Sequence, residues 1–410
     1  MDTQPATMTE IHIQETLTNF ERQVLTPLRQ RFVGKSEIID LIAVTAIAQE
    51  NLLLLGPPGT AKSDLIATFA AHLQGQYFQY LLTKFTEPNE IFGPIDLNKL
   101  REGIVITNTE AMLPDAEFAF LDEVFNANSA ILNSLLTILN ERTFRRGRQR
   151  QSLKLFAVFG ASNALPEDES LRALFDRFLL RVRSQNVEPT QLHALFELGW
   201  TLERTRLTGE SYNGGANASD FTTAQLRQLS RAATMIDLNP IREPYLQLIT
   251  KIRAAGIEVT DRRLVKLLRA VAAAVLLRGQ AVATAADLWV LRYIWSDEDQ
   301  AQVLEEIVQQ MLDEYLSANP DEPVHKLARP FNPYGLDELL IELDTLRQQA
   351  APDKINSVLD ADLLLEQLDT LLRKLEWLQP QPDQQTRLRE ALDQTRILAS
   401  NVEAITRNQI

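Results

Sequence analysis

Short apolar runs and longer amphipathic stretches alternate over the first half of the chain. The runs fall at residues 51–55, 77–82, 117–121, 154–161 and 178–182. Runs that are apolar on both faces are typical of parallel strands with helices covering each side of the sheet. We therefore expect an α/β domain over 30–187, preceded by an N-terminal helical segment over 1–29.

The pattern changes after residue 187, where apolar residues recur almost only at helical spacing. It predicts helices at 190–199, 222–236, 241–255, 261–278 and 284–296. We assign them to an all-α domain over 188–297 and expect a C-terminal helical extension over 298–410. That extension should hold helices near 336–350, 360–378 and 383–406, the last with a coiled-coil-like apolar seam.

The composition excludes several classes of protein. Lys and Arg number 41 against 55 Asp and Glu, a net charge of −14, so the chain as a whole should repel nucleic acid and anionic membranes. Cysteine is absent, which excludes a disulfide framework and a thiolate metal site. No stretch approaches the ~18 consecutive apolar residues of a membrane span, and the N-terminus is unlike a secretory signal. We expect a cytoplasmic protein without membrane insertion.

A candidate phosphate-binding loop follows the apolar run 51–55. It consists of Gly56, Pro57, Pro58, Gly59, Thr60, Ala61, Lys62 and Ser63. Glycines let backbone N–H groups turn toward phosphates, and the helix that follows adds the positive end of its dipole. Lys62 supplies a cation for the β- and γ-phosphates, and the Ser63 hydroxyl can ligate Mg²⁺. We therefore predict a nucleotide-binding loop, with a structural Gly-Pro turn as the alternative.

Ala61 departs from the pattern G-x-x-x-x-G-K-[ST], which has a second glycine at this position. A methyl group is tolerated there if the residue has helical dihedrals. The prediction of a phosphate loop thus includes the expectation of helical dihedrals at Ala61.

Two acidic residues and an amide come at the ends of later apolar runs. Asp122 and Glu123 follow the run 117–121, and Asn163 follows the run 154–161. The carboxyl edge of a parallel sheet is where α/β proteins bind ligands. Asp122 would hold Mg²⁺ through water, and Glu123 would act as the catalytic base on the attacking water. Asn163 would orient that water, with a simple turn residue as the alternative.

Arginines near two other boundaries are candidates for contacts with a γ-phosphate. Arg177 precedes the last apolar run, and an arginine lent to a neighbouring subunit contributes ~10³–10⁵ in rate. Arg172 competes for that role, and a surface ion pair of Arg177 with Asp176 or Glu169 is the alternative interpretation. Arg262 or Arg263, at the start of a predicted helix, could also reach a nucleotide or could lie in solvent.

Together these residues resemble the AAA+ ATPases, and specifically their MoxR family, over about 30–297. The matching motifs are Phe32-Val-Gly-Lys35, the loop 56–63, Phe85-Thr-Glu-Pro-Asn-Glu-Ile-Phe-Gly93, Phe120-Leu-Asp-Glu123, Ile131-Leu-Asn-Ser-Leu-Leu-Thr-Ile-Leu-Asn-Glu-Arg-Thr-Phe144, Gly160-Ala-Ser-Asn163 and Asp176-Arg-Phe178. Asp261-Arg-Arg263, Gly279 and Asp287-Leu-Trp-Val-Leu-Arg292 look most like the RavA branch.

The resemblance implies an ATPase with ATP and Mg²⁺ at the interfaces of a hexameric ring. One subunit would supply Lys62, Ser63, Asp122, Glu123 and Asn163, and its neighbour would supply Arg177. Val33 and Gly34 would contact the nucleotide, Arg262 would be the second sensor, and 188–297 would be the lid domain. Two hairpin-like inserts are expected, at about 95–109 and around Arg145-Arg-Gly-Arg148.

MoxR proteins act with a partner that has a von Willebrand factor A domain, and they remodel or mature other protein complexes. The resemblance therefore implies such a partner and a protein-complex substrate.

A basic segment keeps a different function open. Between Arg142 and Lys154 there are five arginines, one lysine and no acidic residue, a pattern that can grip a phosphate backbone. A nucleic-acid-dependent motor is therefore the alternative function, although an intersubunit contact and an anchor for an acidic polypeptide are competing explanations of the patch. A nucleotide switch without turnover and a helical scaffold also remain open.

Overall fold

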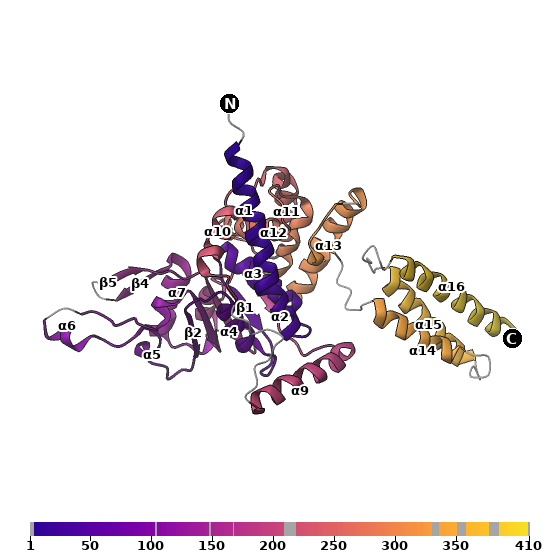
Figure 1. Ribbon diagram of the computed structural model, residues 1–410, viewed down its shortest axis with the longest axis horizontal. Helices are drawn as coiled ribbons and strands as arrows, with labels where there is room; N and C mark the ends of the chain where they lie inside the picture. The colour runs from indigo at the N-terminus through magenta and orange to yellow at the C-terminus, as the bar shows by residue number, and fades with distance from the viewer. Residues whose placement is uncertain are drawn as a thin grey trace. The chain divides into compact units, whose positions relative to one another are not determined.

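The structure is a computed structural model (Figure 1) that describes residues 4–102, 105–146, 149–166, 168–208, 219–320, 322–329, 336–350, 358–376 and 385–408. The chain forms two compact units, 1–329 and 330–410.

A five-stranded parallel sheet lies at the centre of the first unit, in the order β2-β3-β6-β1-β7. Its strands are β1 (Leu52–Leu55), β2 (Tyr77–Leu81), β3 (Phe118–Asp122), β6 (Ala157–Ser162) and β7 (Leu180–Arg183). Each pairing is parallel, with Leu55 opposite Ser162 and Leu81 opposite Asp122. Every residue of β1 and β6 is buried, as expected for strands covered on both faces. The predicted α/β fold is confirmed.

Helices alternate with these strands along the chain. They are α1 (Gln4–Phe20), α2 (Thr26–Arg31), α3 (Ser36–Ala48), α4 (Lys62–His72), α5 (Pro88–Phe92), α6 (Leu97–Arg101), α7 (Ser129–Glu141) and α8 (Glu169–Phe175). A π-helical turn at Glu21–Leu25 joins α1 to α2. Short 3₁₀ turns occupy Leu113–Asp115 and Val124–Asn126.

The remainder of the first unit is helical. It contains α9 (Leu192–Thr208), α10 (Thr223–Ala233), α11 (Arg242–Ala254), α12 (Asp261–Leu277) and α13 (Glu298–Ala318), with short 3₁₀ turns at Pro189–Gln191, Asn239–Ile241 and Lys326–Ala328. The helix predicted at 284–296 is present, but it is a 3₁₀ run, Ala285–Ile294, with a kink at Tyr293. All ten of its residues are buried, so packing against several neighbours overrides the local helical preference.

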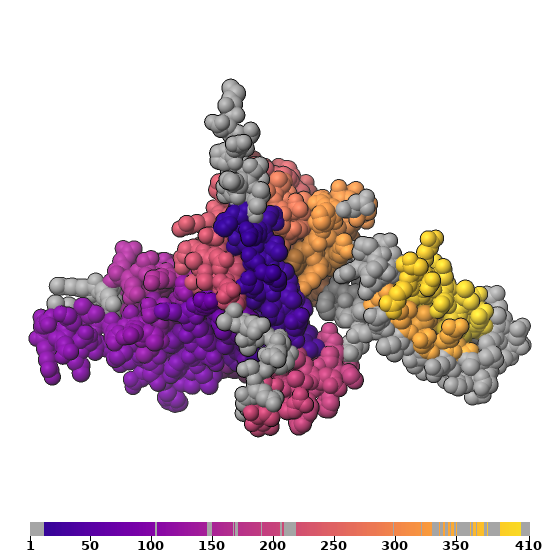
Figure 2. All heavy atoms as spheres, in the orientation of Figure 1, coloured from indigo at the N-terminus to yellow at the C-terminus, as the bar shows by residue number. Residues whose placement is uncertain are grey.

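The N-terminal helix packs on this helical part. Its indigo atoms lie between rose and orange atoms in Figure 2. Phe20 contacts Phe221, with ring centroids 5.2 Å apart, and Gln14 Nε2 donates to Gly279 O at 2.8 Å.

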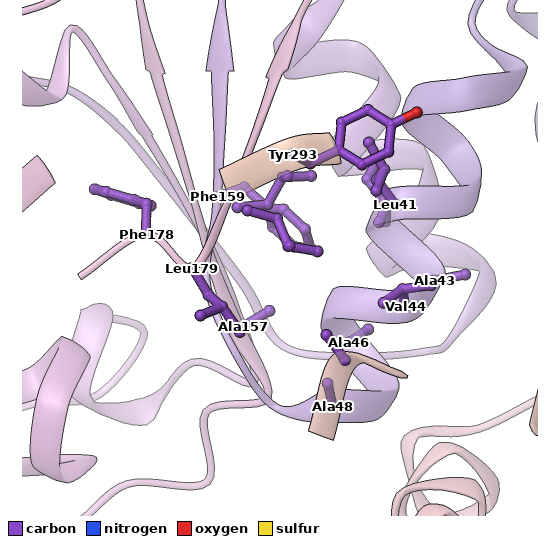
Figure 3. Close-up of a cluster of buried hydrophobic side chains, with 14 of the residues drawn as sticks. Leu41, Ala43, Val44, Ala46, Ala48, Ala157, Phe159, Phe178, Leu179 and Tyr293 are labelled. Carbon is purple, nitrogen blue, oxygen red and sulfur yellow. The ribbon is translucent and has the colours of Figure 1, made fainter. Parts of the chain in front are cut away.

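One hydrophobic core joins the sheet to the helical part. Side chains from α3, such as Leu41 and Val44, lie near Phe159 of β6 and Tyr293 of the 3₁₀ run (Figure 3). Helix α13 packs against that 3₁₀ run and belongs to the same unit. The expected C-terminal extension, 298–410, is therefore divided between two units.

In its described residues, the second unit is a three-helix arrangement with its own core. It consists of α14 (Leu336–Gln349), α15 (Val358–Glu376) and α16 (Gln385–Asn408). Within α16, Leu388, Ala391, Thr395 and Val402 are buried, and α16 packs against α15 and α14. The seam predicted from the sequence is therefore part of this core. None of the helices in the described part of the chain is long and apolar enough to cross a bilayer.

Both predicted inserts form. A bridge between Ile95 and Thr107 closes the first around α6. The second is an antiparallel hairpin of β4 (Thr143–Arg146) and β5 (Gln149–Ser152). Residues 103–104 and the hairpin tip, 147–148, lie outside the described residues.

Candidate active site

The phosphate-binding loop connects β1 to α4 at the carboxyl edge of the sheet. The Gly56 N–H donates to Ser162 O at 3.0 Å, and a Cβ at Gly56 would lie 2.1 Å from Ser184 O. Only glycine fits there, since a side chain would collide with the backbone at the end of β7. Ser184 Oγ lies 3.1 Å from Thr60 Oγ1, so the same segment also holds the middle of the loop.

Lys62 points into this loop. Its ammonium donates to Gly56 O at 2.7 Å and to Pro57 O at 2.8 Å. Burial lowers the pKa of Lys62, and the negative charges of Asp122 and Glu123 oppose that effect. The two carboxylates predicted from the sequence therefore lie close enough to Lys62 to act on its charge.

The backbone of Ala61 is left-handed, with φ 61° and ψ 22°. The expectation of helical dihedrals at this residue is wrong. A side chain in the left-handed region costs about 1–2 kcal/mol, which glycine avoids. The glycine at this position of the general pattern was the signal that the loop requires this conformation.

Glu123 and Asn163 meet at the ends of two neighbouring strands. Asn163 Nδ2 donates to Glu123 Oε1 at 2.6 Å, and the Glu123 N–H donates to Asp122 Oδ1 at 3.0 Å. Glu123 also has a left-handed backbone, with φ 49°. Such strain in a residue other than glycine is concentrated at functional sites. The structure thus brings together the predicted base and the predicted water-orienting amide.

Ser63 and Asp122 are suited to Mg²⁺. A hydroxyl and a carboxylate are the oxygen donors that this ion prefers, and Mg²⁺ usually keeps several waters and binds substrate phosphates as well. The described residues contain no group of three or more His, Asp or Glu side chains that could hold a metal by themselves. The donor set fits an ion that is shared with a phosphate.

The loop with Val33 and Gly34 lies at the same edge. Gly34 has φ 71°, and a Cβ there would lie 2.7 Å from Gln191 Oε1. The Lys35 ammonium donates to Gln185 O, and burial together with the charge of Lys62 lowers the pKa of Lys35. The contacts predicted at Val33, Gly34 and the loop 56–63 are therefore grouped around one edge of the sheet.

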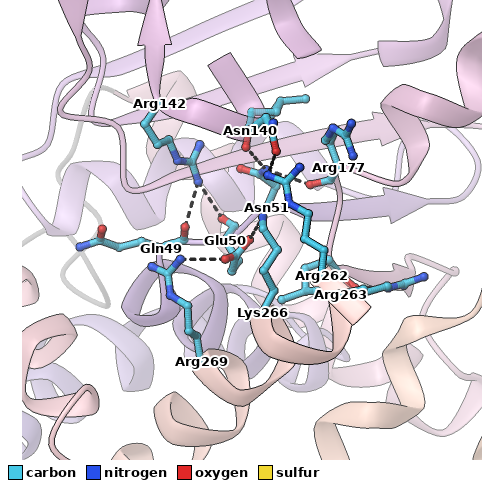
Figure 4. A network of polar contacts seen from close by, with 12 residues as sticks. Gln49, Glu50, Asn51, Asn140, Arg142, Arg177, Arg262, Arg263, Lys266 and Arg269 are labelled. Atoms are coloured by element: carbon cyan, nitrogen blue, oxygen red, sulfur yellow. Dashed lines mark hydrogen bonds and ion pairs between the residues drawn. The ribbon is translucent and has the colours of Figure 1, made fainter. Parts of the chain in front are cut away.

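Arg177 lies at the opposite edge of the sheet (Figure 4). Asn51, directly before β1, donates through Nδ2 to Arg177 O at 2.9 Å. The four residues of β1 separate this edge from the phosphate loop by roughly 13 Å. Arg177 Nε is buried and has no hydrogen-bond partner among the described residues.

The sequence left two alternatives to the role of Arg177, an ion pair with Asp176 and the use of Arg172 in its place. Asp176 forms its ion pair with Arg181, at 3.6 Å. Arg172 lies exposed on α8.

Arg262 and Arg263 have different environments. Arg262 donates to Asn140 Oδ1 beside Arg177, as Figure 4 shows. Arg263 is buried and donates to Leu179 O at 3.3 Å and to Ile294 O at 2.7 Å, and burial lowers its pKa to about 10. Arg263 is thus occupied within the fold, and the structure does not bring Arg262 to the phosphate loop of its own chain.

Sequence reasoning missed residues that hold this amino edge of the sheet together. They include Glu50, Asn51, Lys266 and Arg269. Two polar residues directly before a buried strand, and basic residues at the spacing i, i+4 and i+7 from Arg262, were the available signals.

The fold and the phosphate loop define the AAA+ class of P-loop nucleotide-binding proteins. Residues 19–226, just over half of the chain, match the family described as the MoxR domain in the MoxR-vWA-beta-propeller ternary systems. The chain belongs to the MoxR family of AAA+ ATPases.

Individual relatives agree with this assignment. An uncharacterized protein of Methanocaldococcus jannaschii is 35% identical over 276 residues, which are 67% of this chain and 70% of the relative. The chaperone MoxR1 of Mycobacterium tuberculosis is 27% identical over 160 residues, 38% of this chain and 41% of MoxR1.

A similar solved structure supports the fold. The crystal structure of a candidate ATPase from Cytophaga hutchinsonii superposes with a TM-score of 0.59 and 16% identity, over 75% of this chain and 96% of the other. That likeness concerns the fold alone. The RavA branch stays a prediction.

Proposed function

We propose that this chain hydrolyses ATP with Mg²⁺ in a ring and not as an isolated subunit, because each active site needs two copies. One observation supports this most directly. Lys62, Glu123 and Asn163 lie at the carboxyl edge of the sheet, which we call the first edge. Arg177 and Arg262 lie at the amino edge, which we call the second edge.

The chemistry at the first edge follows from its side chains. Lys62 would exchange its two loop carbonyls for oxygens of the β- and γ-phosphates. Glu123 would accept a proton from the attacking water, and Asn163 would hold Glu123 in position through its 2.6 Å hydrogen bond. The water oxygen bonds to the γ-phosphorus as the bridging oxygen leaves with ADP. Mg²⁺, held by the Ser63 hydroxyl and through water by Asp122, would neutralise phosphate charge when bound.

The second edge would act on a neighbouring subunit. Arg177 cannot reach its own phosphate loop across the length of β1. A head-to-tail interface puts the second edge of one copy against the first edge of the next, and repetition of such an interface closes a ring. We propose six subunits, from the resemblance to the MoxR family and its RavA-like branch. Arg177 and Arg262 would then stabilise the charge of the neighbour's γ-phosphate.

The proposed biological role is remodelling of protein complexes in the cytoplasm. The matching family is named for ternary systems with a von Willebrand factor A protein and a β-propeller protein, and MoxR1 is called a chaperone. We propose that a von Willebrand factor A partner couples this ATPase to its substrate complex, with a β-propeller protein as the third component.

The structure favours this role over a nucleic-acid motor. Arg142, the first arginine of the basic segment, points inward and donates to Gln49 O and Phe156 O at 3.1 and 3.2 Å. Arg145 pairs with Glu141 at 2.9 Å. Arg142 is therefore engaged within the chain, and the charge of Glu141 offsets that of Arg145, so the basic segment is weaker as a phosphate-binding surface than the sequence suggests.

A mixing experiment tests the two-copy site. Arg177→Ala and Lys62→Ala chains should each be inactive, because one lacks the second edge and the other lacks the first. Random mixing of equal amounts makes roughly one interface in four complete, so ATPase activity should reappear. Mixtures that stay inactive, or a wild-type chain that remains a monomer and binds no nucleotide with Mg²⁺, would overturn the proposal.

A further inference from the structure

Basic side chains gather where α12 meets the amino edge of the sheet (Figure 4). They are Arg142, Arg177, Arg262, Arg263, Lys266 and Arg269. Like charges at such short range repel one another, and burial already lowers the pKa of Arg142 to about 10. A nearby negative charge is needed to offset the repulsion between these basic side chains.

Glu50 supplies that counter-charge. Its side chain is 2% exposed, and each carboxylate oxygen has its own partner. Oε2 lies 2.8 Å from Lys266 Nζ, and Oε1 lies 2.9 Å from Arg269 Nη1. Both partners belong to α12, one and two turns after Arg262 on the same face. Glu50 therefore ties the helix that carries Arg262 to the start of β1.

Asn51, the residue after Glu50, holds the backbone of Arg177 in place. Asn51 donates to Arg177 O at 2.9 Å and to Leu139 O at 3.3 Å, and its own Oδ1 accepts from the Val158 N–H at 3.3 Å. Two adjacent backbone positions thus control both arginines of the second edge. Glu50 holds the helix of Arg262, and Asn51 holds the turn of Arg177.

We propose that Glu50 is a positioning residue for ATP hydrolysis in the neighbouring subunit. It locks α12 to the sheet, so that Arg262 and Arg177 are presented together to one phosphate group. Buried ion pairs add little net stability but can specify geometry. The inference rests on the proposed function, since it assumes that the second edge acts on another copy.

The decisive variant is Glu50→Gln, which keeps the shape of the side chain and removes its charge. We expect kcat to fall about 10- to 100-fold, because a misplacement of about 1 Å is enough for such a loss. ATP affinity should remain unchanged, because Lys62 lies at the opposite edge.

Mixed rings separate positioning from general damage. Glu50→Gln chains have an intact first edge, so mixing with Lys62→Ala chains should restore activity. Mixing with Arg177→Ala chains should not, because both chains then lack the second edge. A subunit that is merely misfolded would be rescued by neither.

Two further variants complete the experiment, one as a control and one as a substitute if Glu50→Gln does not fold. Asp261→Asn removes the same charge from the first turn of α12, where the side chain is 98% exposed and pairs with Arg253, and should change kcat less than about twofold. Arg269→Gln removes the half-exposed partner of Glu50 Oε1, so it breaks this ion pair and leaves Glu50 itself unchanged. It should show the same pattern of rescue, and it decides the question if Glu50→Gln does not fold.

The outcomes are distinct. If Arg177→Ala and Lys62→Ala complement each other while Glu50→Gln keeps wild-type kcat, Glu50 has no positioning role and the ring proposal stands. The same conclusion follows if Glu50→Gln and Arg269→Gln both fail to be rescued by Lys62→Ala. If Arg177→Ala and Lys62→Ala fail to complement, the inference falls together with the ring proposal.

Discussion

The two edges of the central sheet are built in different ways. The carboxyl edge depends on short motifs, each placed directly after a strand, and its key residues occupy 56–63, 122–123 and 163. The amino edge depends on side chains from α7, α12, the two residues before β1 and the turn before β7, which packing brings together. Sequence motifs predict the first kind of site, whereas the second can be recognised only from the tertiary structure.

The largest expected effect separates binding at one edge from turnover at the other. Arg177→Ala should lower kcat about 10³-fold or more and leave ATP affinity unchanged, because its own phosphate loop is intact. Lys62→Ala should lose ATP affinity instead. Nucleotide binding and steady-state ATPase assays on both variants test this. Weakened ATP binding by the Arg177 variant as a monomer would contradict the separation of the two edges.

The same substitution at the two ends of β3 should behave differently. Glu123→Gln should reduce turnover about 10²- to 10⁴-fold while ATP still binds, because the proton acceptor is lost. Glu117→Gln lies before the strand and weakens an ion pair with Arg227, at 3.6 Å, and a hydrogen bond from the Gln76 N–H, at 3.3 Å. That control should stay within about twofold in an ATPase assay. Continued hydrolysis by Glu123→Gln would remove Glu123 from the role of base.

Adjacent arginines at the amino edge should separate function from stability. Arg262→Ala should lower kcat about 10-fold with an unchanged melting temperature, because its side chain is exposed. Arg263→Ala should destabilise the first unit by about 2–3 kcal/mol, because it leaves two buried carbonyls without their donor. Thermal unfolding and ATPase rates measured on both variants distinguish the two roles, and a reversed result would exchange them.

The smallest expected effect concerns the strained loop residue. Ala61→Gly should stabilise the chain by about 0.5–1 kcal/mol, since glycine relieves the left-handed strain but increases the freedom of the unfolded chain. Ala67→Gly, in the helical interior of α4, should destabilise it by about 0.5–1 kcal/mol. Denaturant unfolding measures both. Equal losses would show that the loop is not strained at Ala61.

Much of the fold followed from the hydrophobic pattern. The five strands were predicted to within a few residues, and the three helices of the second unit to within two residues at each end. The 3₁₀ run at Ala285–Ile294 was not predicted, because its conformation depends on burial from several sides. Arg142 was counted as part of a basic surface, but the end of α7 turns it toward backbone carbonyls.

The chain sequence by itself determined the phosphate loop, the acidic pair and the amide, because each belongs to a local strand-to-loop pattern whose geometry is set by a few neighbouring residues. Tertiary structure decided which arginine is exposed, which is buried, and which edge each one occupies. Those properties depend on contacts between residues more than 80 positions apart, such as Arg263 with Leu179 and Lys266 with Glu50. Spacing along the chain does not encode such contacts.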